Sequence, residues 1–152
     1  MKNKIAIFPG TFDPFTLGHH DIVLRGLKMF DTIHIAIGNN PEKERYFDVE
    51  LIKNKIEELY KNENKINIIL YNELTAEISK KLNANFILRG LRNTTDFEFE
   101  NSISQINKDI NKDLETVFLI TSPKLAPISS TIIRDVIKYG GDINKYLPYK
   151  IN

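Results

Sequence analysis

The chain has 152 residues, the size of one ordinary domain, and we expect a single domain over residues 1–152. Hydrophobic residues make up 41% of the sequence and charged residues 27%, which excludes a disordered or fibrous protein. The 21 basic and 20 acidic residues leave a net charge of +1, which argues against nucleic acid or an anionic membrane as a partner. The absence of cysteine removes disulfides, zinc–thiolate sites and cysteine nucleophiles.

The N-terminus gives no sign of a targeting segment. Its few apolar residues before Pro9 are fewer than the roughly 7–15 of a secretory signal. No apolar run approaches the ~18 residues that a membrane-spanning helix needs. The sequence therefore predicts a cytoplasmic protein.

The first half of the chain alternates between short apolar runs and amphipathic patterns. Residues 4–8 predict a buried strand, and residues 20–30 a helix with one apolar side. A second strand is expected over residues 32–37, followed by a helix for which Asp48 is the N-cap. The Ile-rich run over residues 66–71 predicts the third strand.

The next elements continue the alternation. We expect a short helix over residues 74–82 and a fourth strand over residues 86–88. Thr95 and Glu98 match a capping box, which predicts that a long helix begins there. Four apolar residues at helical spacing then predict its buried face: Phe99, Ile103, Ile106 and Ile110.

The C-terminal part adds a fifth strand over residues 116–120 and a helix from Ser130 to the glycines at 140–141. Asp142 is expected to cap a last short helix that ends before Pro148. Regular alternation of strand and helix predicts an α/β fold: a Rossmann-like, doubly wound domain with a five-stranded parallel sheet and helices on both faces. Ligands of such folds bind beyond the carboxyl ends of the strands.

A glycine-punctuated loop follows the first strand and ends with Gly18 and His19 at the predicted start of a helix. Backbone N–H groups and the positive end of the helix dipole make such a place an anion site, and a histidine there can bond phosphate oxygens. The alternative is a tight turn with an exposed histidine. The whole string from Pro9 to His20 favours the anion site.

Two arginines, Arg89 and Arg92, lie at the end of the fourth predicted strand. Their guanidinium groups suit bidentate phosphate contacts. The alternative is that one of them pairs with a nearby acid such as Asp96 or Glu98. The presence of both arginines, with a glycine between them, favours phosphate binding.

Two further segments fit an anion site. Lys43 lies in the loop after the second strand, where a solvated charged loop is the alternative interpretation. Residues 128–131, Ile-Ser-Ser-Thr, open the fifth helix, where hydroxyl and N–H groups can hold a triphosphate. Ordinary N-capping by serine is the alternative there, and it is compatible with binding.

These strings together resemble a known family. Gly-Thr-Phe-Asp-Pro at residues 10–14, with Thr-Leu-Gly-His at residues 16–19, resembles the T/H-x-G-H motif of the nucleotidylyltransferase superfamily. Arg-Gly-Leu-Arg at residues 89–92, followed by Asp-Phe-Glu-Phe-Glu, resembles the phosphopantetheine adenylyltransferases in particular. The sequence departs from this pattern at Leu17 and at residues 125–127, so how adenine is held stays open.

The resemblance implies transfer of the adenylyl group of ATP to 4'-phosphopantetheine, giving dephospho-coenzyme A and pyrophosphate. It implies that the catalytic residues are His19, Lys43 and Arg92. It implies these substrate ligands: Thr11, Lys43, Thr75 and Arg89. It implies these ATP ligands: Thr11, Phe12, His19, Gly90, Leu91, Arg92, Glu100, Leu125, Ala126, Pro127, Ile128, Ser129, Ser130 and Thr131. Mg²⁺ held by ATP phosphates and water, a homohexamer, and coenzyme A as a feedback ligand are also implied.

The expected reaction is an in-line attack of the substrate phosphate on the ATP α-phosphorus. A phosphate monoester has a second pKa of about 6 and is largely ionised at neutral pH, so no general base is expected. Three alternatives stay open at this point: a nicotinate mononucleotide adenylyltransferase, a non-catalytic nucleotide-binding module, and a synthetase-like tRNA binder. The last would show steep salt-dependent RNA affinity, which the near-neutral charge disfavours.

Overall fold

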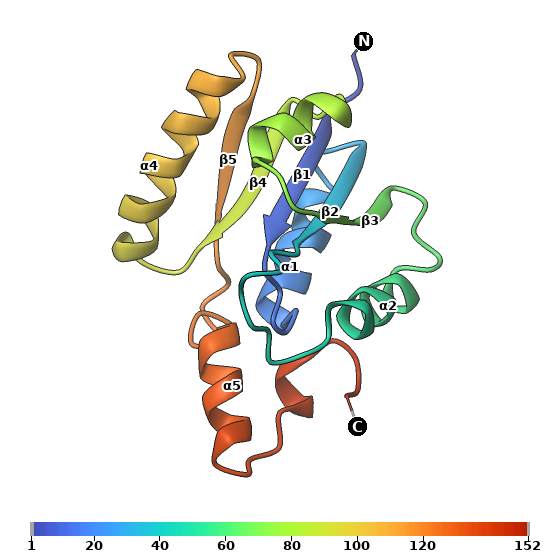
Figure 1. Cartoon of the computed structure of the whole chain (residues 1–152), viewed down its shortest axis with the longest axis vertical. Coiled ribbons are helices and arrows are strands. Elements are labelled where there is room, and N and C mark those ends of the chain that lie inside the picture. The colour runs from blue at the N-terminus through green and yellow to red at the C-terminus, as the bar shows by residue number, and fades with distance from the viewer. Residues whose placement is uncertain (1, 152) are drawn as a thin grey trace.

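In the described part of the chain, five parallel strands form one sheet in the order β3-β2-β1-β4-β5, and five helices connect and cover them (Figure 1). The computed structural model describes residues 2–151. The elements are β1 (Ile5–Gly10), α1 (Leu17–Gly26), β2 (Thr32–Gly38), α2 (Val49–Leu59), β3 (Ile66–Tyr71), α3 (Thr75–Lys81), β4 (Phe86–Leu91), α4 (Thr94–Ile110), β5 (Glu115–Ile120), α5 (Ser130–Lys138) and a 3₁₀ turn (Asn144–Tyr146). Within the described residues, no helix is long and apolar enough to cross a membrane.

The central strand β1 marks the point where the strand order reverses. The chain runs from β1 outward through β2 to β3, then returns to the other side of β1 for β4 and β5. The carboxyl ends of β1 and β4 therefore lie on either side of the switch point. Open α/β sheets bind their ligands at this place.

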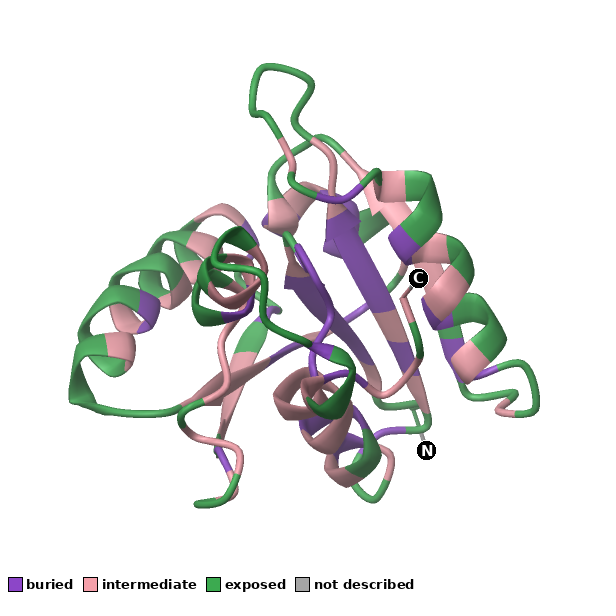
Figure 2. Ribbon diagram, turned by 90° about the horizontal axis from the view of Figure 1, so that it is seen from below, coloured by how far each residue is buried: buried purple, intermediate pink, exposed green. Residues whose placement is uncertain are grey.

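Both faces of the sheet are covered, and each face has its own apolar core. Ile22 of α1, Ile52 of α2 and Ile133 of α5 pack on one face together with the C-terminal segment. Ala76 and Ile78 of α3 pack on the other face, where α4 contributes its last residue, Ile110. Figure 2 shows this arrangement as purple strands in the centre, with purple on the helices only where they face the sheet.

The predicted fold class and the five strands are confirmed, with shifted boundaries. Strand β4 continues to Leu91, three residues beyond the predicted end, because residues 89–91 pair with residues 118–120 of β5. Helix α1 begins at Leu17 and ends at Gly26, so His19 lies inside the first turn. The predicted N-cap Asp48 is confirmed, since its carboxylate accepts a hydrogen bond from the Leu51 N–H.

The prediction for α4 is wrong in two respects. Its N-cap is Asn93, whose side chain accepts a hydrogen bond from the Asp96 N–H, so Thr95 and Glu98 do not form the expected capping box. The predicted buried face points largely to solvent, with Phe99 67% and Ile106 63% exposed. Helix α4 stands beside the edge strand β5 rather than over the middle of the sheet, so one side of it is left uncovered (Figure 1).

Candidate active site

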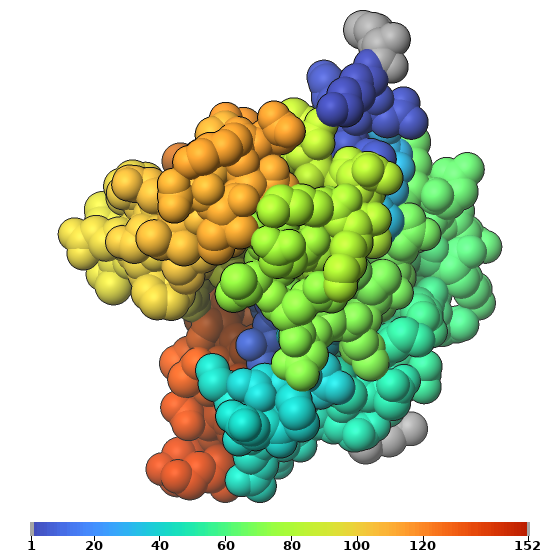
Figure 3. Space-filling view, turned by 45° about the horizontal axis from the view of Figure 1, so that its top comes forward, coloured from blue at the N-terminus to red at the C-terminus, as the bar shows by residue number. Residues whose placement is uncertain are grey.

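Three adjoining hollows follow the carboxyl edge of the sheet. The His19 pocket, about 260 Å³, lies between α1, the β4–α4 connection and the start of α5. The Thr75 pocket, about 210 Å³, lies between β1, α3 and α4. The Lys43 cleft, about 1100 Å³, opens outward along the β2–α2 connection. Figure 3 shows a hollow among segments from distant parts of the sequence, with blue atoms of the N-terminal part visible inside it.

The hollows share lining residues and so form one continuous site. Arg89 and Glu100 line both the His19 pocket and the Thr75 pocket. Thr11 lines both the Thr75 pocket and the Lys43 cleft. A ligand that fills the Thr75 pocket therefore lies next to the His19 pocket on one side and next to the Lys43 cleft on the other. The structure brings together Thr11, His19, Thr75 and Arg89, which lie far apart in the sequence.

The imidazole of His19 is held in one orientation by the residue that precedes α1. The backbone N–H of Thr16 donates a hydrogen bond of 2.9 Å to His19 Nδ1. Because an N–H group can only donate, Nδ1 is the unprotonated nitrogen, and the neutral ring carries its proton on Nε2. The ring also packs edge-on against Phe12, with centroids 5.0 Å apart. The Nε2–H is thus the donor that His19 can offer to a ligand in the pocket.

The electrostatic surroundings keep His19 neutral. Burial lowers its pKa to about 3, and the nearby positive charges of Arg89 and Arg92 act in the same direction. A histidine with this pKa carries no charge at neutral pH. Its Nδ1 lone pair is already occupied by the Thr16 N–H. His19 is therefore suited to donate a hydrogen bond and unsuited to take up a proton.

Arg89 is held by a buried acid at the boundary between two pockets. Its Nε donates to Glu100 Oε2 at 3.0 Å, and its Nη2 forms an ion pair with the other carboxylate oxygen. Its Nη1 donates to the carbonyl of Pro9. Glu100 is the only buried residue that α4 contributes among the described ones, so the pair fixes the helix against the site. Pairing with an acid, the alternative interpretation of the sequence, is thus found, although with Glu100.

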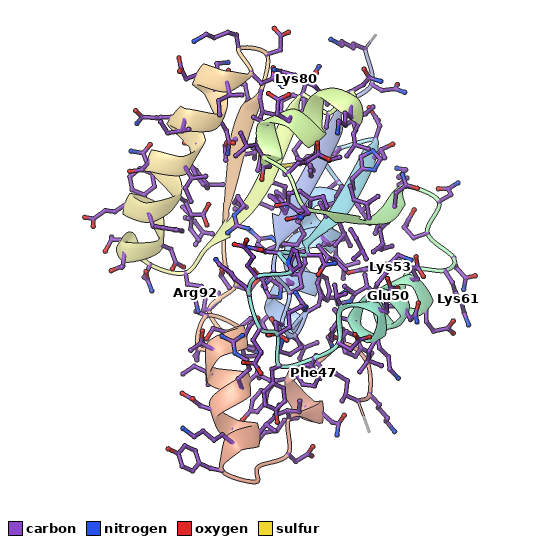
Figure 4. All side chains as sticks on the ribbon, viewed as in Figure 1. Phe47, Glu50, Lys53, Lys61, Lys80 and Arg92 are labelled. Carbon is purple, nitrogen blue, oxygen red and sulfur yellow. The ribbon has the colours of Figure 1, made fainter. Side chains whose placement is uncertain are left out.

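Arg92 also pairs with an acid, and this acid is one that the sequence suggested. The Asp96 carboxylate accepts from Arg92 Nε at 3.1 Å and from Nη2 at 3.3 Å, and also from the Arg92 backbone N–H. These contacts lower the pKa of Asp96 against the opposing effect of burial. Arg92 belongs to the β4–α4 connection and lies near the start of α5, at the His19 pocket (Figure 4).

The start of α5 faces α1 across the His19 pocket. Ser129 caps this helix, because its hydroxyl accepts a hydrogen bond from the Ile132 N–H at 3.2 Å. Ser130 donates to the Pro14 carbonyl at 2.8 Å and so ties α5 to the β1–α1 loop. Both residues and Thr131 line the pocket. Ser129 therefore caps α5 and lines the pocket at the same time.

Lys43 and Thr75 lie in different hollows. Lys43 lines the outer cleft from the β2–α2 connection and is exposed. Thr75 begins α3 and lies within hydrogen-bond distance of the Tyr71 hydroxyl, at 3.2 Å. Tyr71 lines both the Thr75 pocket and the cleft, although no feature of the sequence singled it out.

Some of the expected ligand residues contribute in other ways. The Phe12 side chain is only 3% exposed and packs against Phe8 and Phe15 in the core, and its carbonyl accepts a hydrogen bond from Arg45, so Phe12 is not among the lining residues of the three hollows. Gly90 and Ile128 line the His19 pocket, whereas Leu91 and residues 125–127 are not among its lining residues. Residues 125–127 form a turn in the β5–α5 connection, closed by a hydrogen bond from the Ile128 N–H to the Leu125 carbonyl.

Three polar residues of the site have structural roles that the sequence pattern did not predict. The buried Asp13 carboxylate accepts hydrogen bonds from the backbone N–H groups of Tyr46 and Phe47, at 2.8 and 2.9 Å. Arg45 and Arg134 donate to carbonyl groups of the β1–α1 loop. These contacts join segments more than 30 residues apart, so local spacing carries no signal of them.

The chain is similar to known proteins along most of its length. The chain matches the family described as cytidylyltransferase-like over residues 7–136. It is 59% identical to a phosphopantetheine adenylyltransferase of Cytophaga hutchinsonii, covering 98% of this chain and 99% of that protein. It is 52% identical to a phosphopantetheine adenylyltransferase of Flavobacterium johnsoniae, covering 94% and 93%.

Among solved structures, a similar one is a bifunctional NMN adenylyltransferase/ADP ribose pyrophosphatase of Francisella tularensis. The TM-score is 0.69 at 16% identity, over 99% of this chain and 46% of that one, so the likeness is one of fold. A doubly wound sheet, a pocket lined by His19, Arg89 and Arg92 at its switch point, and a cytidylyltransferase-like sequence define a nucleotidyltransferase. Within that class, the chain belongs to the phosphopantetheine adenylyltransferase family.

Proposed function

We propose that the chain transfers the adenylyl group of ATP to 4'-phosphopantetheine, with release of pyrophosphate. The observation that carries the proposal is the sharing of Arg89 and Glu100 between the His19 pocket and the Thr75 pocket. The ATP phosphates would occupy the His19 pocket, and the pantetheine arm the Thr75 pocket. The two reacting phosphates then meet beside Arg89, whose guanidinium suits bidentate contact with phosphate oxygens.

The reaction proposed is an in-line displacement that needs no general base. An oxygen of the substrate phosphate forms a bond to the ATP α-phosphorus as the bond to pyrophosphate breaks. The attacking oxygen is already ionised at neutral pH, because a phosphate monoester has a second pKa of about 6. A neutral His19 with its proton on Nε2 donates to the α-phosphate as negative charge builds there. Catalysis then consists of positioning and charge stabilisation.

The remaining residues hold the two anions. Thr11, Lys43 and Arg89 would hold the phosphate of phosphopantetheine at the junction of the cleft and the Thr75 pocket. Arg92 and the start of α5 would hold the ATP phosphates. Arg92 pairs with Asp96, and its remaining N–H groups would face the triphosphate.

Magnesium would reach the site with ATP. In the part of the chain that the structure describes, no three His, Cys, Asp or Glu side chains are grouped so that they could hold a metal ion. Mg²⁺ needs no such group when it keeps several waters and is held mainly by phosphate oxygens, as it usually is. Its chemistry there would be to neutralise phosphate charge.

Pyrophosphate release tests the proposal. Purified protein is given ATP together with phosphopantetheine or with nicotinate mononucleotide, in separate reactions. Release with phosphopantetheine alone is expected. Release with the mononucleotide alone would overturn the substrate assignment. ATP binding without pyrophosphate release with either would identify a non-catalytic module.

We also propose that copies of the chain assemble through α4, as a homohexamer by the family resemblance. Phe99, Ile103 and Ile106, spaced four and three residues apart, leave an apolar row exposed on one side of this helix. Exposed rows of this kind mark interaction surfaces. Sedimentation should give a mass about six times 17.6 kDa, and a double substitution of Phe99 and Ile106 by Ser should reduce it. A monomeric wild-type protein would contradict the proposal.

A further inference from the structure

The guanidinium of Arg45 is occupied by backbone carbonyl groups. Its Nη1 donates to the Thr11 carbonyl at 2.6 Å, and its Nη2 to the Phe12 carbonyl at 3.0 Å. Its Nε donates to the Phe47 carbonyl at 3.2 Å, within its own segment. Arg45 therefore bridges the β2–α2 connection and the β1–α1 loop, which are 33 residues apart.

We propose that Arg45 is a positioning residue that fixes the hydroxyl of Thr11 for contact with the substrate phosphate. The proposal rests on the proposed function, because it takes Thr11 as a ligand of that phosphate. Lys43, two residues earlier, lines the same cleft and would contact the phosphate directly. The two neighbouring cations thus have different tasks: Lys43 binds the ligand, and Arg45 acts through the backbone of Thr11.

The loop that Arg45 holds contains a residue with an unfavourable backbone conformation. Phe12 has a φ of 49°, in the left-handed region that non-glycine residues rarely occupy. Its ring folds back over Gly10, where an added Cβ would lie 2.8 Å from the ring. Such conformations persist only where the surroundings hold them in place. Arg45 donates to the carbonyls of the two peptide bonds that flank Phe12, the carbonyl of Thr11 before it and that of Phe12 itself after it.

Two other contacts complete the same clamp. The Asp13 carboxylate accepts from the N–H groups of Tyr46 and Phe47, so the two segments are joined in both directions. Arg134 of α5 donates to the Asp13 carbonyl at 2.7 Å. Three consecutive carbonyls, of residues 11–13, are thereby bonded to arginines. Phe47, which anchors the far side of the clamp, lies in the segment that leads into α2 (Figure 4).

The geometry calls for arginine at position 45 specifically. The Nε and Nη atoms of a guanidinium form a rigid planar fork that can reach carbonyls of two segments at once. The single ammonium nitrogen of lysine keeps the charge but cannot replace three separate nitrogen atoms. Arg45→Lys therefore isolates the loss of the fork from the loss of charge.

A double-mutant cycle with Thr11→Val tests the proposal through kcat/KM for phosphopantetheine, measured by pyrophosphate release at saturating ATP. In the wild-type background, Arg45→Lys should lower kcat/KM by roughly 10²-fold, the size of effect expected when a contact is misplaced by about 1 Å. In the Thr11→Val background, the same change should lower it by less than about threefold, because the hydroxyl to be positioned is already gone.

The cycle separates positioning from a loss of folding. Partial unfolding would remove activity by the same factor in both backgrounds, whereas action through Thr11 would not. Arg45→Gln provides a second variant, and thermal unfolding of each protein gives its folded fraction. Arg25→Gln is the matched control, since Arg25 donates to the Ile120 carbonyl at 2.8 Å in another part of the molecule. Arg25→Gln should change kcat/KM by the same factor in the wild-type and in the Thr11→Val background, whatever the size of that factor.

Equal factors for Arg45→Lys in both backgrounds would overturn the role of Arg45 and leave the proposed function standing. A wild-type protein that releases no pyrophosphate with phosphopantetheine would overturn the proposed function itself. The two failures are therefore read from different measurements.

Discussion

His19 lies at the pocket and its sequence neighbour His20 does not, so the two residues give a matched test of His19 as the proposed hydrogen-bond donor. His19 lines the pocket, whereas His20 Nδ1 lies 2.7 Å from the Tyr60 hydroxyl, outside the three hollows. We expect His19→Ala to lower turnover by roughly 10²–10³, as removal of a preorganised transition-state donor does. ATP affinity should change much less, since the contact strengthens only as charge develops.

Turnover and ATP binding, measured by single-turnover kinetics and calorimetry, check this prediction. His20→Ala is the control, and it should keep most of the turnover in protein that remains folded. Near-normal turnover in His19→Ala would remove this residue from the mechanism.

The low pKa of His19 also links its proton to folding. The pKa is about 3 in the folded protein, against 6.5 for an unperturbed histidine. Between these values the unfolded chain binds a proton that the folded protein does not, so stability contributed by the neutral ring is present above pH 6.5 and is lost as pH falls toward 3. Urea unfolding from pH 7 to pH 4 should therefore show a smaller pH slope for His19→Asn than for the wild type, by about one proton. Parallel slopes would contradict the assignment of a depressed pKa.

Helix α1 lies so close to the sheet that one glycine is required at its end. A Cβ on Gly26 would lie 2.6 Å from Leu88 Cδ2 and 3.0 Å from Ile33 Cδ1, both in the core. We expect Gly26→Ala to lower the free energy of unfolding by about 1–3 kcal/mol, the usual cost of overpacking a core. Denaturant unfolding measures it.

Gly18 of the same helix supplies the matched control. A Cβ there would have ordinary contacts, 3.5 Å from Thr16 Oγ1 and 3.8 Å from the Ile128 carbonyl. Gly18→Ala should be neutral or stabilising by up to ~1 kcal/mol, because alanine is the better helix former. Equal losses in both variants would contradict the prediction, because the close contacts at Gly26 would then not decide the result.

The strands were predictable because each is a short apolar run, buried on both faces of the sheet. Strand β3 has the predicted bounds, and β4 was cut short because Arg89 and Gly90 interrupt the apolar pattern although they still pair with β5. The apolar spacing of α4 identified a helix but not what covers it. A face such as that of Phe99 and Ile106 reads the same in a sequence whether the sheet or another copy of the chain buries it.

The site was predictable where its chemistry is local. The place of His19 at the start of a helix and of two arginines at a strand end is a local pattern that the family motifs reinforce, and the structure places the three residues around one pocket. The contacts of Arg45 and Asp13 could not be inferred, because they join loops that approach each other only in the folded sheet. The buried ring of Phe12 illustrates the same limit, since motif residues can serve the core rather than the ligand.

For the molecule as a whole, the proposed mechanism without a general base predicts a distinctive pH profile of activity. The rate should rise as the substrate phosphate completes its second ionisation near pH ~6 and then stay flat to about pH 9. His19 adds no step in this range, because its pKa lies near 3. Pantetheine without its phosphate should be inert, and Lys43→Ala should lower the rate without adding a step. A basic limb near neutrality that disappears in a His19 variant would show that an acid–base residue acts after all.

The wide sequence separation of the pocket residues has a consequence for how the protein resists degradation. The His19 pocket takes residues from Phe8 to Thr131, so a chain that has lost α1, β4 or α5 has no complete pocket. By the proposed function, only a form with the complete pocket binds ATP, and ATP at 100 times its Kd would add about 2.7 kcal/mol against every opening that breaks the pocket. Amide hydrogens of β2 that exchange only through such openings should slow as much as those of β1. By the proposed function, ATP in the cell would thereby slow proteolysis through every opening that breaks the pocket, also at segments that the ligand does not touch.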